Sequence, residues 1–172
     1  MGKIFYTKQT LYSSELFVKR ILTEFYGIEN AVILRTKNGK PYVESGPHFS
    51  VSHTNGYLFV AFSSENVGLD AELLSRKIHY LPIVKKFSTL EQTEILNEQD
   101  FLYHWTAKES AVKYLGGTLA NDLKKLSFIR SILSYQNEEF PVKIHFFTIK
   151  DCLLAVCSEK DFDTLNLYYY NT

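Results

Sequence analysis

The sequence predicts an α+β fold in which mostly antiparallel sheets pack against helices. Strand patterns and one helix fill the first part of the chain, helical patterns occupy residues 78–117, and strand patterns return after residue 126. Helices and strands in separate stretches are typical of α+β proteins, because strict alternation would build a parallel sheet. The same order predicts two similar lobes, about 1–73 and 74–172, within one domain. Hydrophobic residues make up 45% of the 172-residue chain, enough for a packed core.

A short strand over residues 3–7 and a helix from Ser13 or Ser14 to about Tyr26 are expected first. Serine favours a helix start because its hydroxyl accepts a free backbone N–H, and Gly27 favours the end because glycine tolerates the left-handed conformation. Apolar residues recur at helical spacing along this segment. The expected buried face is Leu16, Phe17, Ile21, Leu22 and Phe25.

Turn signals divide the next segment into short strands. Asn38-Gly39 and Asn55-Gly56 both predict tight turns, because asparagine and glycine adopt positive φ at low cost. The strands and extended pieces expected around these turns are 31–36, 42–43, 49–52, 57–63 and 67–72.

Helical patterns begin again at residues 78–87, where Pro82 interrupts or starts a helix. Ser88 and Glu91 then have the spacing of a capping box, which predicts a helix to about Glu98. Four apolar residues in the first of these segments suit either a docking surface or core packing, of which core packing is favoured. They are Tyr80, Leu81, Ile83 and Val84.

The longest helix is expected over Phe101–Gly117, with Asp100 as its cap and a glycine at its end. Glu109 and Lys113 lie one turn apart on it. Such a pair is commonly an ordinary surface ion pair, worth about 0.2–0.5 kcal/mol. The expected buried face of this helix is Phe101, Leu102, Trp105, Val112 and Leu115.

Strand patterns dominate the last third of the chain. The expected strands are 126–130, 142–147 and 152–158, followed by a last strand that includes Tyr168–Tyr170, and residues 137–139 are expected to form a loop. Cys152 and Cys157 lie in one apolar run without metal-ligand spacing. We therefore expect them to be core residues of a protein in a reducing compartment.

The charge balance argues against bulk binding of nucleic acid or of an anionic membrane. Lys plus Arg and Asp plus Glu both number 19, so the net charge is zero. No apolar run is long enough to span a bilayer. The first ten residues lack a signal-peptide core, and Tyr6 stands where a myristoylation signal needs Ser or Thr. We expect a cytoplasmic protein.

Two carboxylates on one strand form the first candidate site. Side chains alternate along a strand, so within Val67–Glu72 the side chains of Asp70 and Glu72 point the same way. Adjacent carboxylates repel unless a cation or solvent lies between them, and Mg²⁺ prefers such oxygen ligands. The alternative is an exposed strand end with two solvated acids. Gly68 favours the site, because a glycine within a strand often permits close approach of a ligand or backbone.

Polar side chains at residues 50–54 form the second candidate site. Phe49 and Val51 are expected to face the core and Ser50 and Ser52 the other side, with His53 at the end of the strand. Hydroxyl, imidazole and backbone N–H groups suit a phosphate contact. A single histidine in a turn is more often structural, and the other four histidines share no spacing that would indicate zinc.

Four short motifs in this order resemble one enzyme family. They are GKPYV at 39–43, FSVSHT at 49–54, VGLDAE at 67–72 and WTAKESAVKYLGG at 105–117. Their order and spacing are similar to those of the 4′-phosphopantetheinyl transferases, in particular the single-chain type that activates nonribosomal peptide synthetases. The smaller trimeric holo-acyl-carrier-protein synthases place the GxD motif near the amino terminus, so this chain does not resemble them.

The resemblance implies a pseudo-dimer of two lobes that acts as a monomer. It also implies transfer of the phosphopantetheine arm of coenzyme A to a serine of an apo acyl or peptidyl carrier protein, with release of adenosine 3′,5′-bisphosphate. By carry-over, Asp70, Glu72 and Glu109 would hold Mg²⁺, and Glu109 would also accept the serine proton. The groups implied to contact the phosphates are Lys40, Ser52, His53, Lys108 and Lys113.

One departure from the family pattern leaves alternatives open. The GKP motif begins already at Gly39, so the amino-terminal lobe is short, and the basic residues available for the coenzyme 3′-phosphate are Lys3, Lys8, Arg35 and Lys37. A shortened chain is also compatible with a module that binds coenzyme A or a carrier protein without turnover. From the residues alone, Asp70, Glu72, Glu109 and Lys113 also suit a metal-dependent nuclease, but zero net charge argues against it.

Overall fold

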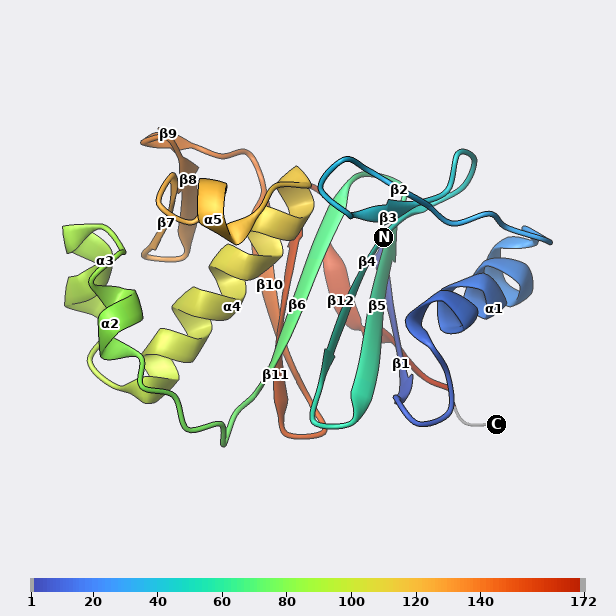
Figure 1. Ribbon diagram of the computed structural model, residues 1–172, viewed down its shortest axis with the longest axis horizontal. Coiled ribbons are helices and arrows are strands. Elements are labelled where there is room, and N and C mark those ends of the chain that lie inside the picture. The colour runs from blue at the N-terminus through green and yellow to red at the C-terminus, as the bar shows by residue number, and fades with distance from the viewer. Residues whose placement is uncertain (1, 171–172) are drawn as a thin grey trace.

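The computed structural model describes residues 2–170, apart from the side chains of residues 163–165. Two sheets stand side by side in the middle of the molecule (Figure 1). One helix, α1, flanks the first sheet, and the other helices gather on the far side of the second. Helices and mostly antiparallel sheets therefore form the expected mixed α+β fold.

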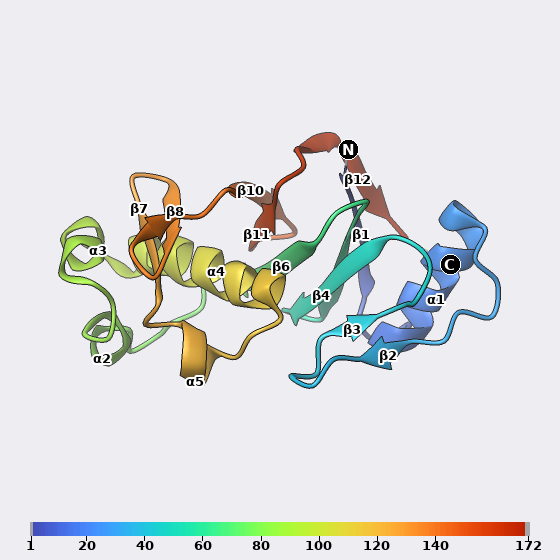
Figure 2. The ribbon, with the colours of Figure 1, turned by 90° about the horizontal axis from the view of Figure 1, so that it is seen from above.

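The first sheet has the strand order β12-β1-β5-β4. Its strands are β1 (Gly2–Lys8), β4 (His48–Thr54), β5 (Tyr57–Ser63) and β12 (Phe162–Tyr169). The β4–β5 hairpin turns at Asn55 and Gly56, whose φ values of 50° and 71° confirm the predicted tight turn. The expected strand 31–36 is reduced to β2 (Leu34–Arg35), which pairs with β3 (Pro41–Tyr42) beside β4 (Figure 2).

Helix α1 (Ser14–Tyr26) has the predicted bounds. The Ser13 hydroxyl accepts the N–H of Leu16, and Gly27 ends the helix at φ 66°. Its buried residues are Phe17, Val18, Ile21 and Leu22. Leu16 and Phe25 were expected in this face but are 53% and 42% exposed, because the helix is rotated so that Val18 meets the sheet instead.

The second sheet has the strand order β10-β11-β6 and packs against α4 (Glu98–Leu115). Its strands are β6 (Val67–Leu73), β10 (Lys143–Ile149) and β11 (Cys152–Ser158). Gly68 permits the contact between strand and helix, since a Cβ there would lie 1.9 Å from the carbonyl oxygen of Ser110. Gly68 predicted the close approach of a ligand or of backbone to this strand, and it is the backbone of α4 that approaches. Cys152 and Cys157 are buried free thiols, as expected.

Helix α4 begins earlier than predicted. The side chain of Asn97 accepts the N–H groups of Gln99 and Asp100, so Asn97 is the cap and the assignment to Asp100 was wrong. The Asp100 carboxylate instead accepts the N–H of Leu96. Gly116 ends the helix at φ 63°. No helix in the described part of the chain combines the length and apolar character needed to cross a bilayer.

The remaining short elements lie beside α4 (Figure 1). They are α2 (Leu81–Val84), α3 (Thr89–Glu94), α5 (Leu119–Asp122), β7 (Leu126–Ile129), β8 (Ile132–Tyr135) and β9 (Glu138–Glu139). The capping box of Ser88 and Glu91 is confirmed, but its helix ends at Glu94 rather than near Glu98. The expected loop at 137–139 contains the short strand β9. Val84 is buried, which supports core packing, whereas Leu81 is 56% exposed.

The two sheets exchange strands between the halves of the chain. β12, from the second half, pairs in parallel with β1, and β6, from the first half, pairs with β11. One hydrophobic cluster joins Ile4 and Phe59 of the first sheet to Leu69 and Leu154 of the second. Each of the two sheets therefore contains a strand from the other half of the chain.

Candidate active site between two sheets

Strands β4 and β6 lie next to each other but belong to different sheets. Serine hydroxyls on β4 connect them, because Ser50 Oγ accepts the N–H of Leu69 at 2.9 Å and Ser52 Oγ accepts the N–H of Ala71 at 3.1 Å. Ser52 is 6% exposed. The Ser52 hydroxyl, predicted to contact phosphate, joins the two sheets in this structure and donates to Asp70.

Asp70 projects from β6 into this junction and is 4% exposed. Its Oδ1 accepts a hydrogen bond from Ser52 Oγ at 3.1 Å and lies 2.8 Å from Lys113 Nζ. Its Oδ2 is buried and has no hydrogen-bond partner among the described residues. A buried carboxylate oxygen without a partner is unfavourable, so this atom is available to a ligand.

Glu72 lies two residues further along β6 and faces the same way as Asp70. It is 8% exposed, and both its carboxylate oxygens lie 2.7 Å from Nη1 of Arg76. No role is predicted for Arg76 from the sequence. The spacing of four residues from Glu72, directly after a strand, was the only signal for this contact.

Glu109 approaches the two acids from α4. Burial and the negative charge of Asp70 raise the pKa of Glu109 to about 8, and Glu72 acts in the same direction. The positive charges of Lys113 and Arg76 oppose this rise. The structure therefore brings Asp70 and Lys113 into contact and places Asp70, Glu72 and Lys113 close enough for their charges to act on Glu109.

The residues in this group suit a divalent cation by their chemistry. Among residues 2–170, the structure shows no group of three or more His, Cys, Asp or Glu side chains arranged as a metal site. The donors are nonetheless carboxylates, which Mg²⁺ prefers. The buried Oδ2 of Asp70 has no partner in the described structure, and burial together with the negative charge of Asp70 raises the pKa of Glu109. A bound cation would give Oδ2 of Asp70 a partner and would offset the negative charge beside Glu109.

Lys108, one residue before Glu109, lies inside the protein. Its Nζ is 2.9 and 3.0 Å from the two carboxylate oxygens of Glu91 and 3.9 Å from the ring centre of Phe87, and it has no exposed surface. Glu91 also accepts the N–H groups of Ser88 and Phe128. The predicted phosphate contact of Lys108 was wrong, because a completely buried ammonium cannot reach a ligand.

Lys40 also differs from its prediction. Its Nζ donates to Asn66 Oδ1 at 2.6 Å, to the carbonyl of Val67 at 3.0 Å and to that of Tyr114 at 3.2 Å. Burial lowers the pKa of Lys40 to about 8. An ammonium has three donors, and in this structure all three are directed to protein oxygens, so a phosphate contact by Lys40 would replace one of these hydrogen bonds. Lys40 instead connects the Asn38-Gly39 turn to β6 and to the end of α4.

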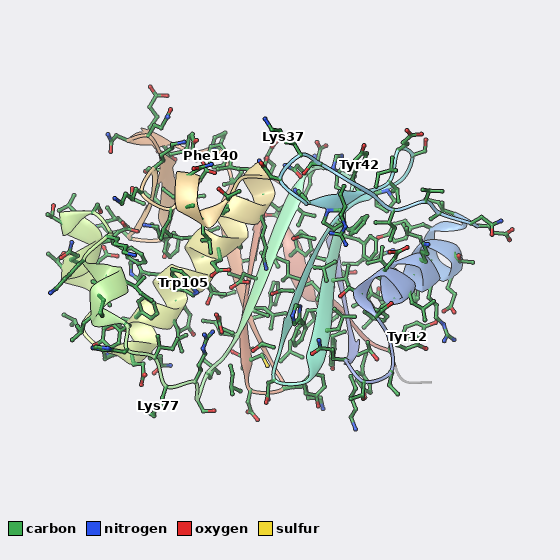
Figure 3. All side chains as sticks on the ribbon, viewed as in Figure 1. Tyr12, Lys37, Tyr42, Lys77, Trp105 and Phe140 are labelled. Carbon is green, nitrogen blue, oxygen red and sulfur yellow. The ribbon has the colours of Figure 1, made fainter. Side chains whose placement is uncertain are left out.

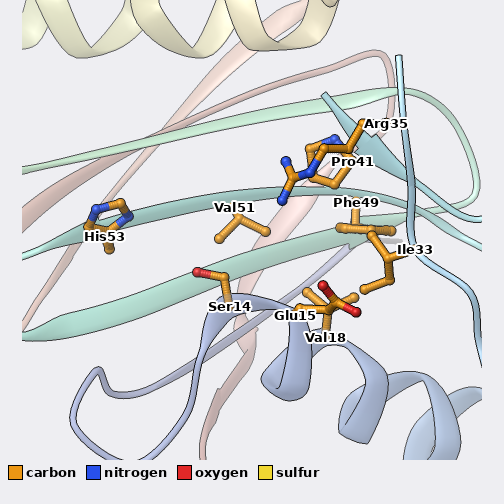
Figure 4. A pocket seen from close by; sticks show the side chains of 9 residues that line it. All are labelled: Ser14, Glu15, Val18, Ile33, Arg35, Pro41, Phe49, Val51 and His53. Carbon is orange, nitrogen blue, oxygen red and sulfur yellow. The ribbon is translucent and has the colours of Figure 1, made fainter. Parts of the chain in front are cut away.

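One cavity lies at this junction and a second lies on the α1 side of β4. The first, of about 220 Å³, adjoins Lys113 and is lined by Asn38, Gly39, Lys40, Pro41, Ser50, Val51, Lys113, Gly116 and Gly117. The second, also of about 220 Å³, lies between β4 and the start of α1, and Figure 4 shows the exposed side chains of His53 and Arg35 around it, with Ser14 below. Of the other candidate cations, Lys37 and Lys8 are exposed, and Lys3 lies over the ring of Tyr26. Lys37 is labelled in Figure 3.

Comparison with known proteins identifies the family. The model of the 4′-phosphopantetheinyl transferase superfamily matches residues 66–157. The chain belongs to this superfamily. The matched segment includes all three carboxylates and Lys113, whereas Lys40, Ser52 and His53 precede it.

Several phosphopantetheinyl transferases are similar to this superfamily member over most of its length. The 4′-phosphopantetheinyl transferase gsp of Aneurinibacillus migulanus is 30% identical over 143 residues, which cover 76% of this chain and 60% of that protein. The 4′-phosphopantetheinyl transferase Sfp of Bacillus subtilis (strain 168) is 29% identical over 137 residues, or 72% of this chain and 60% of that protein. The chain thus spans about three fifths of the length of these relatives.

Proposed function

We propose that this protein transfers the 4′-phosphopantetheine arm of coenzyme A to a serine of an apo acyl or peptidyl carrier protein, releasing adenosine 3′,5′-bisphosphate. The observation that carries the proposal is the gathering of Asp70, Glu72, Glu109 and Lys113 at the junction of the two sheets. These residues lie within the segment that the superfamily model matches.

In the proposed reaction, the serine Oγ forms a bond to the phosphorus that carries the pantetheine arm. The bond from this phosphorus to the bridging oxygen breaks, and its electron pair leaves with the adenosine bisphosphate. The serine proton passes to Glu109, directly or through water. Glu109 suits this role because it is a carboxylate beside the other two acids and Lys113, where the diphosphate would lie.

Asp70, Glu72 and Glu109 are the residues that would hold Mg²⁺. When bound, this ion supplies charge neutralisation on the diphosphate. Lys113 is partly exposed and lines the adjoining cavity, so its ammonium can stabilise charge on the phosphates or the leaving group. Ser52 orients Asp70 through the hydrogen bond to Oδ1.

The nucleotide end of the coenzyme is assigned to the cavity of His53 and Arg35. Both side chains are exposed and line the same space. Of the four basic residues considered for the 3′-phosphate, Arg35 is the one that shares a cavity with His53. Imidazole and guanidinium donors are suited to phosphate oxygens.

The test is intact-mass analysis of apo carrier proteins incubated with the purified protein, coenzyme A and Mg²⁺. We expect one carrier serine to gain the mass of the arm, and the variant Glu109→Gln to lose about 10²–10⁴-fold in rate. The exposed variant Glu138→Gln is the matched control and retains the rate. Carriers from the same host that remain unmodified would contradict the proposal, and coenzyme binding without transfer would instead indicate a binding module.

The location and assembly state belong to the same proposal. We expect a cytoplasmic monomer that binds neither nucleic acid nor membrane. Light scattering on the purified protein measures the assembly state, and a dimer at micromolar concentration would contradict it.

A further inference from the structure

Arg76 lies at the edge of the proposed cation site and has no role in the chemistry described above. The chain turns directly after β6, where the N–H of Arg76 donates to the carbonyl of Leu73 at 3.0 Å. This turn returns the guanidinium to Glu72, with Nη1 2.7 Å from both Oε1 and Oε2. The side chain of Glu72 is 10% exposed, whereas that of Arg76 is 53% exposed.

The two acids on β6 differ in how they are paired. Lys113 contacts only Oδ1 of Asp70, and Oδ2 has no partner in the described structure. At Glu72, the guanidinium contacts both oxygens. A cation that enters the site therefore finds a free oxygen on Asp70 but meets a positive charge at both oxygens of Glu72.

We propose that Arg76 is an internal counter-ion of Glu72 that competes with the divalent cation and so lowers the affinity of the site for it. The inference rests on the proposed function, because it takes Glu72 as a cation ligand. In the cation-free protein, Arg76 compensates the buried charge of Glu72. When a cation binds, Arg76 moves away from Glu72.

The exposure of Arg76 makes this exchange feasible. A half-exposed guanidinium can be solvated by water when it leaves its partner, since ion pairs at the surface contribute little. If Arg76 remained in place, its positive charge would lie within several ångströms of the doubly charged cation. At a distance of about 6 Å in a water-like dielectric, that repulsion corresponds to about a tenfold loss of affinity.

The experiment measures cation binding directly, without turnover. Mn²⁺ replaces Mg²⁺ as the probe, because the electron paramagnetic resonance signal of free Mn²⁺ falls on binding, and Mg²⁺ is then used to displace it. The variants are Arg76→Gln, which removes the charge, and Arg76→Lys, which keeps it. Lys77→Gln is the matched control, since Lys77 is the next residue, is 89% exposed and pairs with Glu98 instead.

We expect Arg76→Gln to bind Mn²⁺ about three- to tenfold more tightly than the wild type, with the difference shrinking as salt is raised. Arg76→Lys and Lys77→Gln should stay within about twofold of the wild type. Equal or weaker binding by Arg76→Gln, with binding by the wild type intact, would overturn the inference alone and indicate that Arg76 orients Glu72. Absence of Mn²⁺ binding in both proteins would overturn the proposed cation site and the inference with it. Circular dichroism confirms that each variant is folded.

Discussion

At the scale of single residues, burial decides what each charged group can do. Glu109 is partly buried near two other acids, so its charged form is unfavourable and its pKa rises to about 8. Lys108 is its neighbour in sequence, but a complete lack of exposure and two contacts with Glu91 make it a structural residue. One position along a helix thus separates the residue proposed as the base from one that is buried in an ion pair.

The raised pKa of Glu109 predicts a pH-dependent stability. An acid whose pKa is higher in the folded state binds more protons there than in the unfolded chain, so its contribution to stability is complete below about pH 4.5 and is lost as the pH rises to about 8. We expect urea denaturation in EDTA to show a larger loss of unfolding free energy between pH 5 and pH 8 for the wild type than for Glu109→Gln. An equal loss in both proteins would contradict this interpretation. Saturating Mg²⁺ should reduce the difference.

The buried pair of Lys108 and Glu91 predicts a large effect on stability. Lys108→Met leaves the Glu91 carboxylate buried without its counter-charge, which should lower the unfolding free energy by about 3–5 kcal/mol. Adding Glu91→Gln should recover part of the loss, because it removes the unpaired charge. Denaturant titration measures both. A Lys108→Met protein of normal stability but weakened coenzyme binding would instead support the phosphate contact.

At the scale of elements, the site depends on the contact between β6 and α4. β6 carries Asp70 and Glu72, and α4 carries Glu109 and Lys113. Gly68 allows the two backbones to touch. Any side chain at this position must push the helix away from the strand, and with it Glu109 away from the other acids.

Gly68→Ala should therefore affect both stability and activity. The added Cβ would lie 1.9 Å from a backbone oxygen, and overpacking of this kind typically costs about 1–3 kcal/mol. We expect a lower melting temperature and weaker Mn²⁺ binding. The control is Gly56→Ala, where the Cβ meets open space and only the positive φ is strained. Cation binding should be unchanged in this control, and equal cation binding in both variants would contradict the role of Gly68.

At the scale of the whole molecule, a few polar contacts join the two sheets beside their shared core. The hydroxyls of Ser50 and Ser52 connect β4 to β6, and Asn38 Nδ2 donates to the carbonyl of Gly116 at 2.8 Å. Lys40 adds contacts with the start of β6 and the end of α4. These contacts hold the cavity beside Lys113 in shape.

Removing the ammonium of Lys40 should weaken this connection. Lys40→Met leaves its three oxygen acceptors with fewer donors, which should lower the unfolding free energy by about 1–3 kcal/mol. Lys37→Met, an exposed change in the same turn, should stay within about 0.5 kcal/mol of the wild type. Denaturant titration compares them. Normal stability of Lys40→Met together with weaker coenzyme binding would restore the phosphate contact.

The sequence by itself determined the local elements and the chemical groups of the site. The bounds of α1, the hairpin turn at Asn55-Gly56, the capping box of Ser88 and the shared direction of Asp70 and Glu72 all follow from short-range spacing. The order of four motifs also predicted the family that the comparisons confirm. Such features were predictable because backbone dihedrals and side-chain periodicity depend on neighbouring residues.

Only the tertiary structure decided which charged residues are free and which are occupied. Lys108 meets a partner 17 positions away and Lys40 one 74 positions away, and no local pattern encodes either contact. The parallel pairing of β12 with β1 and the exchange of strands between the two halves likewise depend on distant segments. Burial and ion pairing are properties of the packed chain, so the same lysine that suggests a ligand contact in the sequence becomes a structural residue in the fold.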